Sequence, residues 1–249
     1  MQAKVILLPR DLEPADGAGR TVVVFDVMRA TTTITAALAA GVREVHVFGS
    51  VDAARQAAAS TSPRPLLCGE IECLPPPGFD LGNSPRQWDR AQHAGSIAFL
   101  ATTNGTRALT AAAALKPANL LVGAVVNAQA VGKVIRRLGA DVTLLCAGTG
   151  GAVSMEDLIG AGAILDELTA GGVQFEDDGQ VAWRLFQAYR RNLHGVFRIA
   201  RGGRNLIRAN HAEDIDFCAQ WSCLFEVGQA HLPDATGGLT ICPFELEDR

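Results

Sequence analysis

The sequence lacks the features that would indicate a membrane protein, an exported protein or a nucleic-acid-binding protein. No stretch free of Lys, Arg, Asp and Glu exceeds the sixteen residues of 117–132, which is too short to span a bilayer. No run of five like charges occurs, and 22 Lys and Arg against 26 Asp and Glu give a net charge of -4, so we expect no nucleic-acid partner. Only four apolar residues in a row precede Pro9 and Arg10, fewer than the core of a signal peptide contains.

Paired cysteine motifs are also absent. No CxxC pair occurs, and the two pairs spaced by four residues have no histidine at the distance expected in a zinc finger. A structural zinc site is therefore not expected, and we interpret the thiols as reduced, mostly buried apolar groups of a cytoplasmic protein. The six cysteines are Cys68, Cys73, Cys146, Cys218, Cys223 and Cys242.

What the sequence does contain is an alternation of short apolar runs and Ala-rich helical stretches. Hydrophobic residues make up 48% and charged residues 19% of the 249 residues, which is ordinary usage for a soluble globular protein. The pattern predicts a three-layer α/β/α fold with a mostly parallel or mixed central sheet. The predicted strands are 4–9, 21–26, 44–48, 96–102, 119–126 and 141–147, with helices between them such as 30–41 and 105–116.

The last third of the chain is more helical. We predict helices over 154–171, 177–193, 203–209 and 212–220, followed by weaker strands at 224–227 and 238–244. No long linker interrupts the chain, so residues 1–249 are interpreted as a single domain with a helical C-terminal portion, and a homodimer is left open. Segment 62–87 contains six of the eleven prolines, and an irregular connection of this length is typical of a functional loop.

Polar residues follow three of the predicted strands, where an α/β sheet binds its ligands. The first group includes Asp26, Arg29, Thr31 and Thr32, the second Thr103, Asn104, Gly105 and Arg107, and the third begins at Gly148 and reaches Asp157. Helix N-termini, turn glycines and arginines together favour a phosphate or another doubly charged anion. The alternative is that the hydroxyls only cap helices and the arginines are surface charges.

Four carboxylates are expected near the same strand ends. Mg²⁺ prefers oxygen ligands, commonly one or two carboxylates with water and substrate phosphate, so a magnesium-assisted transfer of phosphate to water is one interpretation. For the last two residues of the group, stabilisation of a helix N-terminus is the alternative. The four are Asp26, Glu70, Glu156 and Asp157.

The common phosphoryl-transfer motifs do not occur. The segment GTGGAVSM has no lysine where a P-loop needs one and does not complete GxGxxG. Asp26 has no second aspartate two residues later, as the aspartyl-nucleophile arrangement requires, and no cysteine has an arginine six residues later. The site is therefore predicted to be of a less common type.

Five motifs, taken in order, resemble the 2-phosphosulfolactate phosphatase family. They are DVMRATTTITAALAAG, CGE, GFDLGNSP, TTNGTRAL and CAGTGGAVSMED, and the resemblance extends from about residue 20 to about residue 220. It implies a three-layer α/β/α fold and an Mg²⁺-dependent phosphatase acting on 2-phospho-3-sulfolactate, a step toward coenzyme M. The site residues it implies are Asp26, Arg29, Thr31, Thr32, Glu70, Asn83, Ser84, Thr103, Asn104, Arg107, Glu156 and Asp157.

The C-terminal third departs from the family pattern. Gly202 stands where the pattern has histidine, and Ser222 stands where it has aspartate. If either family residue contributes to the site, activity or substrate choice would differ in this chain.

These observations lead to one mechanistic hypothesis and one rival. In the first, Asp26 with Glu70 or Asp157 holds Mg²⁺ and Arg29 and Arg107 bind the phosphate and a second anionic group of a small phosphomonoester. A covalent phosphoenzyme through Asp26 or Cys146 stays an open variant, although its position favours Cys146 as a buried spacer. The rival is a non-catalytic anion-binding protein of the same family.

Overall fold

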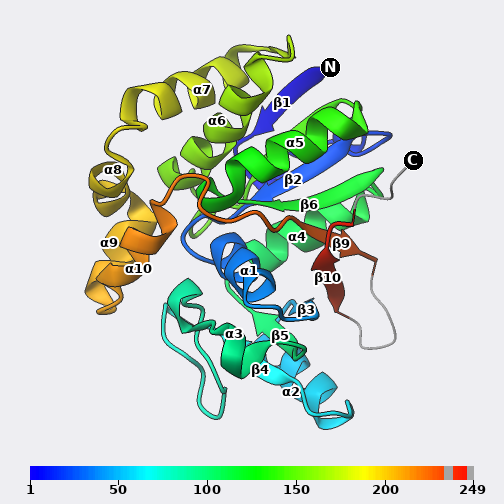
Figure 1. Cartoon of the computed structure of the whole chain (residues 1–249), viewed down its shortest axis with the longest axis vertical. Helices are drawn as coiled ribbons and strands as arrows, with labels where there is room; N and C mark the ends of the chain where they lie inside the picture. Colours follow the sequence, from blue (N-terminus) through cyan, green and yellow to red (C-terminus); the bar gives the residue numbers. More distant parts are fainter. Residues whose placement is uncertain (233–237, 246–249) are drawn as a thin grey trace.

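The computed structural model describes residues 1–232 and 238–245, whose ten strands form one mixed sheet in the order β4-β5-β3-β10-β9-β6-β2-β7-β1-β8 (Figure 1). In that order the strands are Leu66–Gly69, Ile97–Ala101, Glu44–Phe48, Leu239–Pro243, Gly228–His231, Asn119–Gly123, Thr21–Phe25, Val142–Cys146, Gln2–Ile6 and Gln174–Phe175.

The sheet consists of two parallel blocks joined by an antiparallel hairpin. Strands β4, β5 and β3 are parallel to one another, and so are β6, β2, β7, β1 and β8. Between the blocks, β3 pairs with β10, β10 with β9, and β9 with β6, each time antiparallel. Three reversals in succession mean that the two blocks run in opposite directions. The sheet is therefore mixed, one of the two forms that the alternating pattern predicts.

Helices cover both faces of this sheet. The α-helices α1 to α10 are Ala30–Ala39, Val51–Ala59, Arg90–His93, Gly105–Ala114, Ala128–Leu138, Met155–Thr169, Asp177–Tyr189, Leu193–Ile199, Arg201–Arg208 and Ala212–Cys218. Four short 3₁₀ turns, η1 to η4, are Pro9–Asp11, Pro14–Asp16, Pro85–Gln87 and Val125–Asn127. Figure 1 places α5, α6 and α7 on one side of β2, and α8, α9 and α10 together at the left-hand side of the molecule.

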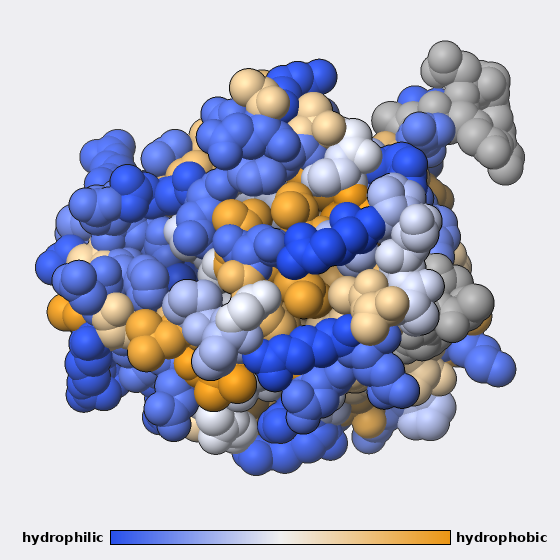
Figure 2. All heavy atoms as spheres, turned by 90° about the horizontal axis from the view of Figure 1, so that it is seen from below, coloured by the Kyte–Doolittle hydropathy of each residue, from blue (hydrophilic) through white to orange (hydrophobic). Residues whose placement is uncertain are grey.

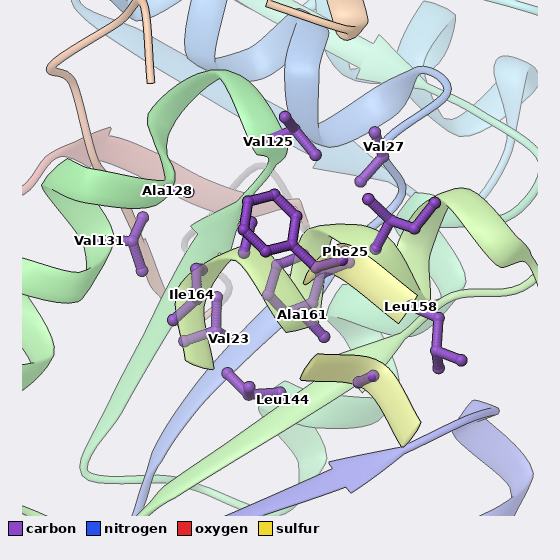
Figure 3. Packing of buried hydrophobic residues seen from close by; sticks show 14 of the residues in the cluster. Val23, Phe25, Val27, Val125, Ala128, Val131, Leu144, Leu158, Ala161 and Ile164 are labelled. Atoms are coloured by element: carbon purple, nitrogen blue, oxygen red, sulfur yellow. The ribbon is translucent and has the colours of Figure 1, made fainter. Parts of the chain in front are cut away.

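Strand β2 shows how the three layers arise from the sequence. Its side chains alternate: Val23 and Phe25 pack with α5 and α6, whereas Val22 and Val24 pack with α1 and α4. All five residues of the strand are buried, which explains why it has an uninterrupted apolar sequence. Figure 3 shows the ring of Phe25 in the middle of the first of these clusters. The predicted three-layer arrangement is confirmed.

The other predicted elements differ from the structure mainly at their ends, with two corrections. Segment 62–87 is not wholly irregular, because it contains β4, a strand of only four residues that the surrounding prolines conceal. The predicted strand at 224–227 does not form. There, the backbone N–H of Leu224 donates to the Val126 carbonyl in η4, and the strand begins at Gly228.

The face of the molecule seen from below is mostly hydrophilic (Figure 2). Figure 2, seen from below, shows apolar residues gathered in the middle of that face between two bands of hydrophilic residues. Within residues 1–232 and 238–245, no helix has both the length and the apolar character needed to cross a bilayer.

Candidate active site

Four strand ends meet around one cavity of about 200 Å³. Loops after β2 and β7 of one block and loops after β4 and β5 of the other line this cavity together. Helix α9 supplies the rest of the wall. The lining residues are Asp26, Met28, Arg29, Glu70, Glu72, Cys73, Asn83, Thr103, Asn104, Thr149, Gly150, Gly202 and Asn205.

Asp26 is held at the end of β2 by the turn that follows it. Its backbone N–H donates to Thr31 Oγ1 over 3.1 Å, and its carbonyl accepts from the Thr31 N–H over 3.0 Å. Thr32 Oγ1 donates to the Val27 carbonyl over 2.8 Å. Both threonines are fully buried and neither lines the cavity. Their position supports shaping of the turn rather than the predicted contact with substrate.

The Asp26 carboxylate lies on the cavity wall in a strongly perturbed environment. Burial and the nearby carboxylates of Glu70 and Glu156 raise its pKa from the ordinary 3.8 to about 7. Backbone N–H groups of Ala30 and Gly105, at the starts of α1 and α4, donate to the carboxylate and act in the opposite direction. Such a group can accept or release a proton near neutral pH.

Glycine is required at position 105 by this contact. A Cβ there would lie 2.7 Å from Asp26 Oδ2 and 2.6 Å from Ala30 Cβ. Asn104, the residue before, reaches the other block, because its Oδ1 accepts from the Gly150 N–H over 3.3 Å. The start of α4 thus closes the cavity between the two blocks.

Arg29 also lines the cavity, but its charge is already compensated. Its Nη1 donates to Asp214 Oδ2 over 2.7 Å, and its Nη2 donates to the Cys73 carbonyl over 3.0 Å. Asp214 accepts a further hydrogen bond from Ser84 Oγ over 2.6 Å. Arg29, Asp214 and Ser84 are all buried. Sequence analysis did not single out Asp214 as a site residue, because its partner lies 185 positions away. Its only signal in the sequence is that Asp214 and Ile215 match an Asp-Ile pair in the C-terminal part of the family pattern.

Glu70 connects the loops after β4 and β5. Its Oε1 accepts from the Thr103 N–H over 2.7 Å, and its Oε2 accepts from the Cys73 N–H over 2.9 Å. The tight turn from Ile71 to Leu74 projects Glu72 and Cys73 against the cavity, with φ of 52° and 69° at these two residues. A non-glycine residue with positive φ raises the free energy of the folded backbone by about 1–3 kcal/mol. The hydrogen bonds that Glu70 and Arg29 form with Cys73 hold the turn in place.

Asp157 and Glu156, next to each other on α6, have different surroundings. Asp157 accepts from the Val27 N–H over 2.9 Å and from the Gly148 N–H over 3.0 Å, so it ties the loops after β2 and β7 together. It is buried away from the cavity lining, a placement that fits positioning better than the predicted catalytic and metal-binding roles. Burial raises its pKa well above the usual range.

Glu156 faces α9. Its Oε1 accepts from the Gly202 N–H over 3.1 Å, and a Cβ at Gly202 would lie 2.2 Å from that oxygen. The family histidine could therefore not replace Gly202 without moving Glu156. Burial also raises the pKa of Glu156. Of the two departures from the family pattern, this one lies on the cavity wall. The other, Ser222, lies outside the lining, where its Oγ accepts from the Gln129 N–H in the first turn of α5 over 3.1 Å.

Some buried polar atoms have no hydrogen-bond partner within the described residues. Near the cavity these are Asn83 Oδ1, Thr102 Oγ1 and Glu156 Oε2. Unpaired buried polar atoms are uncommon in native proteins, and at a cavity they are the atoms that water, a cation or a substrate would satisfy. Asn83, which lines the cavity, is thus well placed for its predicted substrate contact.

Arg107 and Cys146, which the sequence hypotheses also named, lie outside the cavity lining. Arg107 is exposed on the first turn of α4, so its contact with substrate stays a prediction. Cys146 is fully buried in β7, and burial raises the pKa of its thiol well above the usual range. A buried neutral thiol supports the interpretation of Cys146 as a spacer, since attack on phosphorus needs the thiolate.

The residues around the cavity fit Mg²⁺ better than a soft metal. Within the part of the chain that the structure describes, no three His, Cys, Asp or Glu side chains form a ready-made metal cage. Mg²⁺ does not need one, because it keeps several waters and takes one or two carboxylates. Glu70 and Glu156 offer oxygen ligands close enough to Asp26 to raise its pKa, and Glu156 Oε2 has no hydrogen-bond partner in the described part of the chain. A bound cation would offset the negative charge of these carboxylates and would give Glu156 Oε2 a partner.

Comparison with known proteins gives a consistent result. A family model described as 2-phosphosulpholactate phosphatase matches residues 6–230. A protein of Symbiobacterium thermophilum named probable 2-phosphosulfolactate phosphatase is 39% identical over 218 residues, which cover 86% of this chain and 93% of the relative. Proteins of the same name from Carboxydothermus hydrogenoformans and Thermus thermophilus are 34% and 37% identical, over 94% and 80% of this chain and 95% and 83% of their own lengths.

Proposed function

Because the chain belongs to the 2-phosphosulpholactate phosphatase family, we propose that it is a Mg²⁺-dependent phosphatase that hydrolyses the phosphate ester of a small acidic hydroxy acid, with 2-phosphosulfolactate as the first substrate to test. The observation that carries the proposal is the position of Asp26. Its carboxylate lies on the cavity wall, with a pKa near 7, between the N-termini of two helices.

The chain's own residues suggest how the phosphate is bound. The first turn of α4 has backbone N–H groups without intrahelical acceptors, and the positive end of its dipole favours an anion. Thr103, Asn104 and Asn83 add polar side chains to the same wall. Arg29, neutralised by Asp214, acts by fixing the turn above the cavity rather than by adding net positive charge.

Asp26, with Glu70 or Glu156, would supply the one or two carboxylates that hold the cation. When bound, Mg²⁺ supplies charge neutralisation for the phosphoryl oxygens and lowers the pKa of water. A cation held there would keep the Asp26 carboxylate ionised, so that one of its oxygens could accept a hydrogen bond from the attacking water and orient it. Asp157 keeps the loops after β2 and β7 in register around this group.

The test is release of inorganic phosphate from 2-phosphosulfolactate by the whole chain, with Mg²⁺ and with chelator. We expect Mg²⁺-dependent turnover that falls at least roughly a hundredfold in Asp26→Asn, which removes the charge but keeps the shape. Asp11→Asn, a change at an exposed aspartate outside the cavity lining, is the matched control and should leave turnover unchanged. Full activity with chelator would remove the metal from the mechanism.

Two further outcomes separate the alternatives. Binding of the ester without release of phosphate, with or without Mg²⁺, would favour the non-catalytic anion-binding protein. Acid quenching with radiolabelled substrate tests for a covalent phosphoenzyme, and label trapped on the wild-type protein but not on Asp26→Asn would make Asp26 a nucleophile.

A further inference from the structure

A groove next to the catalytic cavity continues it along α9. The groove, here called the side groove, has a volume of about 440 Å³ and is lined by Glu72, Cys73, Leu74, Asn205, Arg208 and Ala209. Three of these residues, Glu72, Cys73 and Asn205, also line the catalytic cavity. The two spaces therefore share a wall, formed by the 71–74 turn on one side and by α9 on the other.

Helix α9 gives this continuous space a direction. Gly202 and Asn205, three positions apart, line the catalytic cavity, and Asn205, Arg208 and Ala209 line the side groove. Residues three or four apart lie on one face of a helix. A ligand lying along this face would extend from Asp26, past Asn205, to Arg208.

Arg208 differs from the arginine of the catalytic cavity in its charge balance. Arg29 is buried and paired with Asp214, whereas Arg208 is exposed and forms no ion pair with any residue in 1–232 or 238–245. Of the arginines that line the two spaces, Arg208 is thus the one with an uncompensated charge. A guanidinium in this state can bind a carboxylate or sulfonate through two parallel hydrogen bonds.

We propose that the side groove is a second substrate subsite, in which Arg208 binds a carboxylate or sulfonate at the far end of a phosphomonoester too long for the catalytic cavity alone. The proposal rests on the proposed phosphatase function and adds the class of substrate. Asn205, whose side-chain amide has no hydrogen-bond partner in the described part of the chain, lies midway and would contact polar groups between the two ends.

Glu72 is the acidic residue among those that line the side groove. It is exposed and lies on the wall common to both spaces, where its negative charge opposes an anionic ligand. Loss of charge at Glu72 should therefore strengthen binding of an anionic tail, whereas loss of charge at Arg208 should weaken it. Opposite changes in affinity at these two positions are difficult to explain by general damage to the fold.

The experiment compares two series of substrates with the full-length protein and Mg²⁺. One series consists of phosphate esters of ω-hydroxy carboxylic acids of increasing chain length, and the other of alkyl phosphates of the same lengths. The measured quantity is the ratio of kcat/KM between the acid and the alkyl ester at each length. We expect this ratio to rise with length and then to fall roughly tenfold or more in Arg208→Gln, through KM with little change in kcat.

Control variants show whether the charge of Arg208 causes the preference for acid esters. Arg208→Lys should restore part of the ratio, Glu72→Gln should raise it, and Arg198→Gln, at an exposed arginine of α8 that lines neither space, should leave it unchanged. Equal losses on acid and alkyl esters, or no preference for acid tails in the wild-type protein, would overturn the proposal.

Failure of the proposed function would give a different result. If no ester is hydrolysed, calorimetric titration with an ω-carboxyalkyl phosphonate and the matched alkyl phosphonate measures the subsite directly. Tighter binding of the acid that disappears in Arg208→Gln would support the subsite without turnover. Equal binding of the two phosphonates would reject the subsite as well.

Discussion

The buried carboxylates around the cavity set the pH response of this protein. Asp26, Glu156 and Asp157 each have a pKa raised mainly by burial, so each binds its proton more tightly in the folded than in the unfolded chain. The folded protein therefore takes up protons relative to the unfolded chain as the pH falls toward 4. Burial of these three carboxylates therefore destabilises the metal-free fold at neutral pH.

The raised pKa of Asp26 sets both the direction and the pH range of a change in stability. Its pKa is about 7 folded and near 3.8 unfolded, so the free energy of unfolding of the metal-free protein should fall as the pH rises from 4 through 7. Asp26→Asn removes this penalty and should be more stable than wild type at pH 8 by up to about 4 kcal/mol, with no gain near pH 3.5. Urea unfolding with chelator at both pH values measures the difference. A variant less stable than wild type at pH 8 would contradict the assignment.

The buried ion pair of Arg29 and Asp214 leads to a second prediction, which concerns stability. Asp214→Asn would leave the buried guanidinium without a counter-charge, and we expect a loss of roughly 3–5 kcal/mol in the free energy of unfolding. Activity should also fall, because Arg29 holds the turn that bears Cys73.

Asp216, on the same helix but exposed and paired with His194, provides the control. Asp216→Asn should cost no more than about 1 kcal/mol. Similar losses for the two variants in urea unfolding would mean that the buried pair adds nothing specific.

Among the elements, helix α4 begins in close contact with the site, because its first residue, Gly105, lies against Asp26. Gly105→Ala would place a Cβ 2.7 Å from Asp26 Oδ2, so either the helix or the carboxylate must move. We expect kcat to fall at least tenfold, since a displaced charged group no longer meets the developing charge of the reaction.

A second glycine separates this effect from a general intolerance of alanine. A Cβ on Gly49, just before α2, would meet no atom within 4 Å, so Gly49→Ala should keep wild-type kinetics. Unchanged kcat in Gly105→Ala would show that the start of α4 yields to the side chain without cost to the site.

At the scale of the whole molecule, the β9–β10 hairpin joins the two blocks that form the cavity. Ile241 of β10 is fully buried in a cluster with Val45 and Val47 of one block and Val22 and Val24 of the other. Ile241→Ala should lower the free energy of unfolding by roughly 2–5 kcal/mol and lower the temperature at which activity is lost. Activity and circular dichroism, followed together during heating, measure both effects.

An exposed isoleucine provides the comparison. Ile199 is 60% exposed at the end of α8, so Ile199→Ala should leave both transitions nearly unchanged. If activity in Ile241→Ala were lost well below the loss of secondary structure, the two blocks would separate before either unfolds.

Much of the fold was predictable because the signals are local. A buried parallel strand shows as a short apolar run and an amphipathic helix as a period of 3.6 residues, so β2, β3, β7, α1, α4 and α6 could be placed from the sequence. The elements that were missed, such as β4, or misplaced, such as the start of β9, are short and depend on their partners for definition.

The candidate site shows the same division. The sequence alone was enough to place Asp26, Thr103 and Asn104 at strand ends, because polar residues directly after an apolar run indicate such a position, whereas Glu70 follows β4, a strand that was missed. Only the tertiary structure decided that two opposed blocks bring these ends together, that Asp214 neutralises Arg29, that Asp157 binds backbone rather than lining the cavity, and that Glu156 packs against Gly202. Each of these depends on contacts between residues 46 to 185 positions apart, and no periodic pattern along the chain encodes such distances.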